Sequence, residues 1–325
     1  MSNSDIKMDK RGEGFNTQIS IVLPVHNGAK YLRESIESCM NQTFPHWELI
    51  LVNDCSTDDS GTIAEEYAAK DQRIRVIHNE TNLKLPASLN AGFRQAKGEY
   101  LTWTSDDNRY LPHALQRMID FLRDNPQYKM VCAACEQIDE EGKSMNSVHV
   151  PLQCHLLCGN SVGACFLYHR NVLETVGEYD SSCFLAEDYD YWLRVGQQFQ
   201  IGSIDEVHYC YRMHSNSLTS TRQADVLRID SELKRKYWQH YHQLLSAEER
   251  KQILVRLAAV NAIDSYRQMK RYFPEGLALL KDRRAIQRHF FKQRYLLPIS
   301  DAIKLPEQLL RRWVIKPIKK RLKAA

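Results

Sequence analysis

The sequence predicts an α/β fold, in which a mixed, mostly parallel sheet flanked by helices is followed by a helical C-terminal extension. Over residues 18–104, short apolar runs rich in β-branched residues alternate with helical patterns, which is typical of βαβ units. Further strand-like runs follow as far as residue 211 without regular alternation, which favours a mixed sheet there. After residue 223 no strand pattern remains.

The first half of the chain supplies strands and helices in strict alternation. We predict strands at 18–25, 47–52, 73–78 and 99–104, and helices at 29–40, 60–70 and 85–97. The pair Ser56 and Asp59 is a capping signal for the second helix, and Pro86 falls in the first turn of the third, where proline is tolerated. Such βαβ units imply a mostly parallel sheet with right-handed crossovers.

The second half has a less regular pattern. We predict helices at 112–123 and 189–198, strands at 130–138, 144–150, 162–169 and 200–211, and C-terminal helices broken at Pro274, Pro298, Pro306 and Pro317. The turn Asp139–Gly142 favours a hairpin between the first two of these strands. The predicted organisation is a disordered leader over 1–17, a main domain over 18–222 and a helical region over 223–325.

Composition excludes some classes of protein. The 44 Lys and Arg against 40 Asp and Glu give a mildly basic chain, which argues against a nucleic-acid binder. No apolar run is long enough to span a bilayer, and the N-terminus lacks the apolar core of a signal peptide. We therefore expect a cytoplasmic protein.

Nine cysteines allow two interpretations. Cys132 and Cys135, followed by Cys154 and Cys158, resemble the spacing of zinc ligands. However, the run KMVCAACEQI (129–138) has the pattern of a buried strand, in which small Cys and Ala side chains pack well. We interpret these cysteines as core residues whose thiols stay reduced in the cytoplasm.

Adjacent acids follow the fourth predicted strand in the motif TWTSDDN (102–108). Asp106 and Asp107 repel each other unless a positive charge lies between them, and Mg²⁺ or Mn²⁺ is commonly shared between carboxylates and substrate phosphates. In open α/β sheets, ligands bind beyond the carboxyl ends of the strands. The motif indicates a metal–nucleotide site, with a solvated helix-capping turn as the alternative.

The first two predicted strands also end in polar residues. PVHNG (24–28) leaves backbone groups exposed after the first strand, and Asp54 after the second can accept a hydrogen bond from a base or a ribose. A helix cap or Asx turn is the alternative for Asp54. The chain has neither GxGxxG after the first strand nor GxxxxGK[ST], which argues against a Rossmann dehydrogenase and a P-loop NTPase.

Two later motifs carry further candidate groups. In AEDYDYWLR (186–194), Asp188 lies at the start of a predicted helix, where the dipole favours an ionised carboxylate suited to a general base. The alternative is that Glu187 and Asp188 serve only to complement the helix dipole. In YRMHSNS (211–217), Arg212 and His214 are suited to a diphosphate or its metal, unless this is an ordinary surface loop.

These motifs together resemble glycosyltransferase family 2 over about residues 18–220. In order they are PVHNGAKYL, VNDCSTDDS, NLKLPASLNAGF, GEYLTWTSDDN, GACFLYHRNVLETVGEYD, AEDYDYWLR and YRMHSNSLT. The resemblance implies a GT-A catalytic domain, a nucleotide-diphospho-sugar donor (usually a UDP-sugar), Mn²⁺ or Mg²⁺, and hexosyl transfer with inversion at the anomeric carbon. The general acceptor class would be a glycan or a lipid-linked glycan of a surface polysaccharide or lipopolysaccharide.

By this likeness, each candidate residue has an expected role. Asp188 is the expected catalytic base, and Asp107 with His214 the expected metal ligands. The expected donor-binding residues are Pro24, Val25, Asn27, Asp54, Asn82, Asn90, Asp106, Glu187 and Arg212, with Asp54 on the base and Asp106 beside the metal. The chain departs from the family in carrying Thr104 where many relatives have an acid and Lys84 where many have glycine.

The last residues predict a separate property. The segment 309–325 (LLRRWVIKPIKKRLKAA) combines basic and apolar side chains without an acid, which favours peripheral contact with the anionic cytoplasmic face of a membrane. The alternative is a solvated tail that docks on its own domain.

Two alternatives to a glycosyltransferase function also remain. A sugar nucleotidyltransferase would normally show a Gly-rich basic loop after the first strand, and a non-catalytic sugar-nucleotide binder would not need Asp107 and Asp188.

Overall fold

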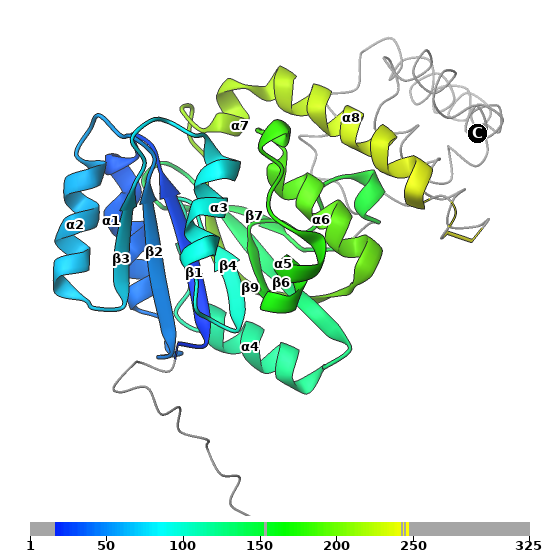
Figure 1. Ribbon diagram of the computed structural model, residues 1–325, viewed down its shortest axis with the longest axis horizontal. Coiled ribbons are helices and arrows are strands. Elements are labelled where there is room, and N and C mark those ends of the chain that lie inside the picture. Colours follow the sequence, from blue (N-terminus) through cyan, green and yellow to red (C-terminus); the bar gives the residue numbers. More distant parts are fainter. Residues whose placement is uncertain (1–16, 153–154, 242, 244, 247–325) are drawn as a thin grey trace, which may run out of the picture. The chain divides into compact units, whose positions relative to one another are not determined.

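The computed structural model describes residues 17–152 and 155–241, together with 243, 245 and 246. Within them, one nine-stranded sheet has the order β3-β2-β1-β4-β8-β6-β9-β5, and β7 pairs with β6 (Figure 1). The strands are β1 (Ile19–Val25), β2 (Trp47–Asn53), β3 (Ile74–His78), β4 (Tyr100–Trp103), β5 (Arg109–Tyr110), β6 (Tyr128–Ile138), β7 (Ser144–His149), β8 (Cys165–His169) and β9 (Gln200–Arg212).

Helices cover this sheet. They are α1 (Ala29–Met40), α2 (Ser60–Lys70), α3 (Leu85–Gln95), α4 (Ala114–Asp124), α5 (Arg170–Val176), α6 (Glu187–Gln198), α7 (Leu218–Thr221) and α8 (Gln223–Tyr241), with short 3-10 helices at Leu156–Cys158 and Ser181–Cys183. In Figure 1, α1 and α2 lie on one side of the parallel strands and α3 on the other.

The four strands β3, β2, β1 and β4 run parallel. Ile21 and Leu23 of β1 belong to the same core cluster as Leu32 of α1. Val22 points to the opposite face, where a Cβ on Gly92 of α3 would lie only 2.4 Å from it. Because β1 is buried on both faces, its sequence is a nearly continuous apolar run, interrupted only by Ser20, rather than an alternating one.

The remaining strands form both antiparallel and parallel pairs. β8 lies antiparallel between β4 and β6, while the long strands β6 and β9 are parallel to each other. Cys132 and Cys135 are buried within β6, as the strand interpretation requires. Cys154 lies outside the described residues. The predicted mixed, mostly parallel α/β sheet with flanking helices is therefore confirmed.

Several boundaries differ from prediction for local reasons. The strand predicted from residue 162 begins at Cys165, because Gly163 has φ +82° and interrupts an extended chain. The helix predicted to reach 97 ends at Gln95, where Ala96 is extended and frees the Lys97 N–H to donate to Glu48 Oε1 at 2.6 Å. The elements β5, α5 and α7 were not predicted, because segments this short show no periodicity.

Helix α8 packs on α6. The Tyr237 hydroxyl donates to Asp190 Oδ1 at 2.7 Å, and the Tyr241 hydroxyl donates to the Leu193 carbonyl at 2.8 Å. One compact unit extends to Gln243, and the division at residue 222 stays a prediction. The leader over 1–16, the helix-breaking prolines after residue 273 and the basic tail over 309–325 lie outside the described residues. None of the described helices has the length and apolarity needed to cross a bilayer.

Candidate active site

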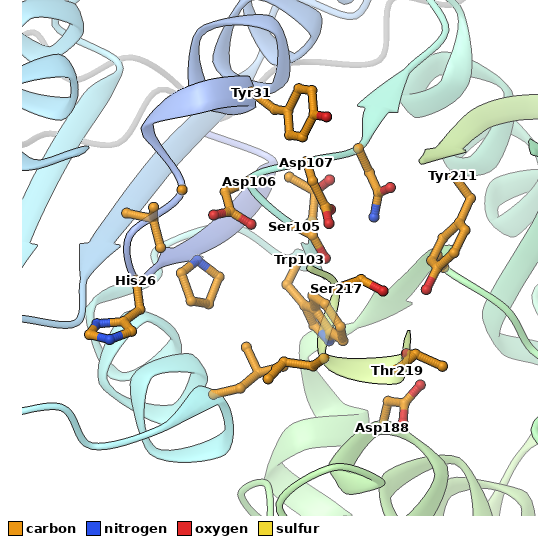
Figure 2. A pocket seen from close by; sticks show the side chains of 18 of the residues that line it. His26, Tyr31, Trp103, Ser105, Asp106, Asp107, Asp188, Tyr211, Ser217 and Thr219 are labelled. Carbon is orange, nitrogen blue, oxygen red and sulfur yellow. The ribbon is translucent and has the colours of Figure 1, made fainter. Parts of the chain in front are cut away.

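A cavity of about 740 Å³ opens where β1, β2, β4 and β9 end and α6 begins. Figure 2 shows Asp106 and Asp107 near Tyr31 on one side of this cavity and Asp188 on the other. The strands β1, β2 and β4 are parallel, so their carboxyl ends meet at one edge of the sheet. The volume is in the range of small-molecule sites.

The fold brings together all but two of the predicted site residues. Those lining the cavity are Pro24, Val25, Asn27, Asp54, Asn82, Asp106, Asp107, Glu187, Asp188 and His214. They come from segments up to 190 positions apart in the sequence. The shared location supports the idea of one site built from the strand ends, as the sequence predicted.

Asn90 and Arg212 do not line the cavity, so direct donor contact by either residue lacks support. The Asn90 amide exchanges two hydrogen bonds with the backbone of Tyr179, at 2.8 and 2.9 Å. The Arg212 guanidinium is 1% exposed and donates to the Asp107 carbonyl at 2.9 Å and to Glu34 Oε2 at 2.7 Å. Arg212 therefore holds the backbone of the acidic loop rather than facing a ligand.

Asn27 and Gly28 shape the wall after β1. Asn27 has φ +56°, and its Oδ1 accepts from the Thr57 N–H at 2.7 Å, which ties this loop to the one after β2. A Cβ at Gly28 would lie 1.6 Å from Asp106 Oδ2. Position 28 must therefore be glycine for Asp106 to occupy its place in the wall.

Asp54 organises the loop that precedes α3. Its Oδ1 accepts from Asn79 Nδ2 and from the Leu83 N–H, both at 2.8 Å, and its Oδ2 accepts from the Lys84 N–H at 2.9 Å. The residue is 3% exposed. Most of the acceptor capacity of this carboxylate is therefore used within the protein, a contribution that the sequence did not reveal.

Asp107 and His214 form the part of the cavity best suited to a divalent cation. His214 Nε2 lies 2.9 Å from Asp107 Oδ2, whereas Asp107 Oδ1 is buried and has no hydrogen-bond partner among the described residues. Burial and the charge of Asp107 raise the pKa of Asp106 to about 8. An unpaired carboxylate oxygen beside an imidazole and a second acid fits a hard divalent ion.

Thr104 occupies the position where many relatives have an acid. Its hydroxyl is buried and hydrogen-bonded to the Tyr209 hydroxyl at 2.7 Å. It therefore offers no charge to a cation, and Asp107 and His214 remain the candidate ligands.

Asp188 and Glu187 form a second acidic pair at the first turn of α6. Asp188 Oδ2 accepts from Asn160 Nδ2 at 2.6 Å, and its Oδ1 accepts from the Tyr189 N–H at 2.7 Å. Burial and the neighbouring Asp188 charge raise the pKa of Glu187 to about 8, and burial also raises the pKa of Asp188. Because two N–H donors favour ionised Asp188, the pair holds its negative charge on Asp188 and its proton on Glu187 near neutral pH.

Sequence reasoning missed Asn160. The residue lines the cavity and holds Asp188, but it lies in a loop 28 positions away from that acid. A lone asparagine outside any strand or helix gives no local signal of such a role.

A second group of candidate ligands lies under α6, where Asp180, Cys183 and Asp190 bring their ligand atoms within 4.8 Å of one another. The Asp190 carboxylate already accepts from Arg194 Nε at 2.8 Å and from the Tyr237 hydroxyl at 2.7 Å. Since its charge is balanced by these groups, we interpret this cluster as part of the packing between α6 and α8.

The sheet, its flanking helices and the acid-lined cavity at the strand ends define a glycosyltransferase of the GT-A class. The model of the family "Glycosyl transferase family 2" matches residues 20–186, and the chain belongs to this family. The predicted family and enzyme class are therefore confirmed.

Relatives agree with this assignment. An uncharacterised glycosyltransferase of Rickettsia prowazekii is 32% identical over 222 residues, covering 64% of this chain and 67% of that protein. TuaG of Bacillus subtilis, named as a proposed teichuronic acid biosynthesis glycosyltransferase, is 31% identical over 104 residues, covering 32% of this chain and 41% of its own.

The crystal structure of S. aureus TarS 1-349 in complex with UDP-GlcNAc matches with a TM-score of 0.58 at 18% identity, covering 91% of this chain and 78% of that one. At this identity the likeness concerns the fold.

Proposed function

We propose that this protein is an inverting glycosyltransferase that moves a sugar from a nucleotide-diphospho-sugar, in the first instance a UDP-sugar, to an acceptor hydroxyl. The observation that carries the proposal is that Asp107 and Asp188 lie on opposite sides of one cavity (Figure 2). His214 is next to Asp107, and Asn160 is hydrogen-bonded to Asp188. A leaving group and a nucleophile must lie on opposite faces of the sugar for inversion. Asp107 with His214 would serve the leaving group, and Asp188 with Asn160 would serve the nucleophile.

In this mechanism Asp188 is the general base. It takes the proton of the acceptor hydroxyl as that oxygen bonds to C1 of the donor sugar, while the bond from C1 to the diphosphate breaks. Protonated Glu187 keeps a second negative charge away from the developing nucleophile. The N–H groups of Asn160 and Tyr189 hold both oxygens of Asp188, which fixes its orientation before the acceptor arrives.

At the donor end, Asp107 and His214 would hold Mn²⁺ or Mg²⁺. Such an ion supplies Lewis-acid neutralisation of the departing diphosphate. Pro24, Val25 and Asn27 would border the nucleotide, and the free acceptor capacity of Asp54 would face its base.

We place the reaction in polysaccharide or lipopolysaccharide synthesis. TuaG is named for teichuronic acid biosynthesis, and TarS has been crystallised with UDP-GlcNAc, which supports a polymer-building reaction and a UDP-sugar donor. The acceptor class, and membrane contact by the basic tail at 309–325, are inferred from the sequence.

Two measurements test the proposal. A thermal-shift screen of nucleotide sugars with and without Mn²⁺ identifies the donor, because a ligand that binds only the folded state raises Tm. With that donor, Asp188→Asn should lower the rate of Mn²⁺-dependent hydrolysis or transfer by about 10²–10⁴-fold while the donor-induced thermal shift is kept. Asp205→Asn, an exposed acid of β9 outside the cavity, is the matched control.

Each alternative gives a different result. A sugar nucleotidyltransferase would form the nucleotide sugar from a sugar phosphate and a nucleoside triphosphate, and a non-catalytic binder would bind donor without hydrolysing it. A D188N enzyme that works at the wild-type rate contradicts the assignment of the base.

A further inference from the structure

The backbone at Lys84 is strained. Its φ of 71° and ψ of 163° fall in a region that is occupied almost only by glycine, because a Cβ there collides with the neighbouring backbone. Glycine would adopt this conformation without that strain. A strained non-glycine residue that persists at the edge of a site calls for a role for its side chain.

The strained conformation is fixed from two sides. The Lys84 N–H donates to Asp54 Oδ2 at 2.9 Å and to Asn82 Oδ1 at 3.0 Å, and the Lys84 carbonyl accepts the Ser88 N–H at 3.0 Å as α3 begins. The loop is thus held in place by Asp54 and by the helix. The backbone therefore fixes the direction of the Lys84 Cα–Cβ bond at the edge of the cavity.

That side chain brings a positive charge to a cavity lined with acids. The lining contains two lysines, Lys30 and Lys84, against the six acids Asp54, Asp106, Asp107, Glu140, Glu187 and Asp188. Lys30 Nζ is paired with Glu140 Oε2 at 3.0 Å. Across the described part of the chain, the Lys84 ammonium has neither an ion pair nor a hydrogen bond, so of the two lining lysines it is the one available to a ligand.

We propose that Lys84 is a donor-binding residue whose ammonium contacts an anionic oxygen of the nucleotide sugar. The oxygen belongs either to the diphosphate or to an acidic sugar, and both share the same chemistry. The inference rests on the proposed function, because it needs a nucleotide-sugar donor in this cavity. It adds a specific cation to the donor site, held there at the expense of backbone strain.

Two substitutions separate the charge from the strain. Lys84→Met keeps a side chain at the strained position and removes the charge, whereas Lys84→Gly removes both. The ligands are UDP-glucose, UDP-glucuronic acid and, from a panel of UDP, GDP, CDP and ADP with Mn²⁺, the nucleoside diphosphate that binds the wild type most tightly. Both variants should bind about tenfold more weakly to those ligands that carry the oxygen that Lys84 contacts. K84G should in addition raise Tm of the free protein by about 2–4 °C, and K84M should not.

Further arms identify the oxygen and control for net charge. If Lys84 contacts the diphosphate, K84M weakens binding of the diphosphate but not of the parent nucleoside. If it contacts an acidic sugar, K84M leaves the diphosphate unaffected and weakens UDP-glucuronic acid but not UDP-glucose. Lys84→Arg should retain affinity, and Lys97→Met, which removes an exposed lysine outside the cavity, should change nothing.

The outcomes separate the inference from the proposed function. A K84M protein that binds the diphosphate and both sugar nucleotides like the wild type overturns the role of Lys84 and leaves the proposed function intact. A wild type that binds no nucleoside diphosphate and no nucleotide sugar overturns both.

Discussion

Two pairs of adjacent acids face each other across the cavity, and they differ in what surrounds them. In each pair one acid, Asp106 or Glu187, has its pKa raised to about 8 by burial and by its neighbour. Asp107 is next to an imidazole and has one oxygen without a partner among the residues that the structure describes, whereas both oxygens of Asp188 accept N–H donors. The same local pattern therefore suits a cation on one side and a proton on the other.

The difference teaches that the neighbours of an acid, rather than the acid itself, determine its chemistry. Fixed N–H donors stabilise a carboxylate that is ionised and ready to accept a proton. A carboxylate oxygen without a hydrogen-bond donor is costly to bury unless it coordinates a cation. Substitution of Asp107 should thus impair cation binding, whereas substitution of Asp188 should impair proton transfer.

The largest difference is expected for Asp107→Asn. Loss of the charged ligand should abolish the extra thermal shift that Mn²⁺ gives in the presence of donor, and lower donor turnover about 10³-fold. Asp188→Asn should keep the Mn²⁺-dependent shift and lose only turnover. Titration of both variants with Mn²⁺ and donor in a thermal-shift assay checks this, and an unchanged Mn²⁺ response in D107N would show that the ion is held elsewhere.

The sequence predicted the acids themselves more fully than the groups that surround them. The acids themselves follow strand ends or begin a helix, so periodicity and capping rules locate Asp106, Asp107 and Asp188. The parallel strands β1 to β4 were also predicted closely, because each is a local apolar run between helices. Family resemblance supplied the roles of these acids.

What surrounds the acids is set by contacts between distant segments, which a single sequence does not reveal. Asn160 reaches Asp188 from a loop, and Arg212 reaches the Asp107 carbonyl from 105 positions away. Arg212 was predicted to bind donor because it belongs to the polar segment at the end of the last strand. Successive residues of β9 face opposite sides, so Tyr211 lines the cavity while the Arg212 side chain is buried, and His214 lies beyond the end of the strand.

A smaller effect, on stability, tests the proton assigned to Glu187. Its folded pKa of about 8 lies above the ordinary value of 4.5, so the folded state retains a proton that the unfolded chain has lost. The stability from this group is complete below about pH 4.5 and is lost as pH rises through about 8. Glu187→Gln mimics the protonated acid, so we expect its unfolding free energy to fall less with pH.

The measurement is urea unfolding of wild type and E187Q at several values between pH 5 and pH 9. The difference in unfolding free energy should move in favour of E187Q by about 4 kcal/mol over this range. Asp106 titrates in the same window in both proteins, so the difference between them isolates Glu187. A constant difference across the range would mean that Glu187 is ionised throughout.

The smallest effect is expected for Asn160→Ala, and it should depend on pH. The hydrogen bond from Asn160 lowers the pKa of Asp188 against the effect of burial, so its loss should raise that pKa. Less of the enzyme would then carry an ionised base in mildly acidic solution. We expect donor turnover to fall about tenfold near pH 6 and to approach the wild-type value at higher pH, where Asp188 is ionised in both proteins. Rate–pH profiles of N160A, with Asn41→Ala at the exposed residue that follows α1 as control, check this. A loss of the same size at every pH would instead mean that Asn160 acts on the substrate and not through the ionisation of Asp188.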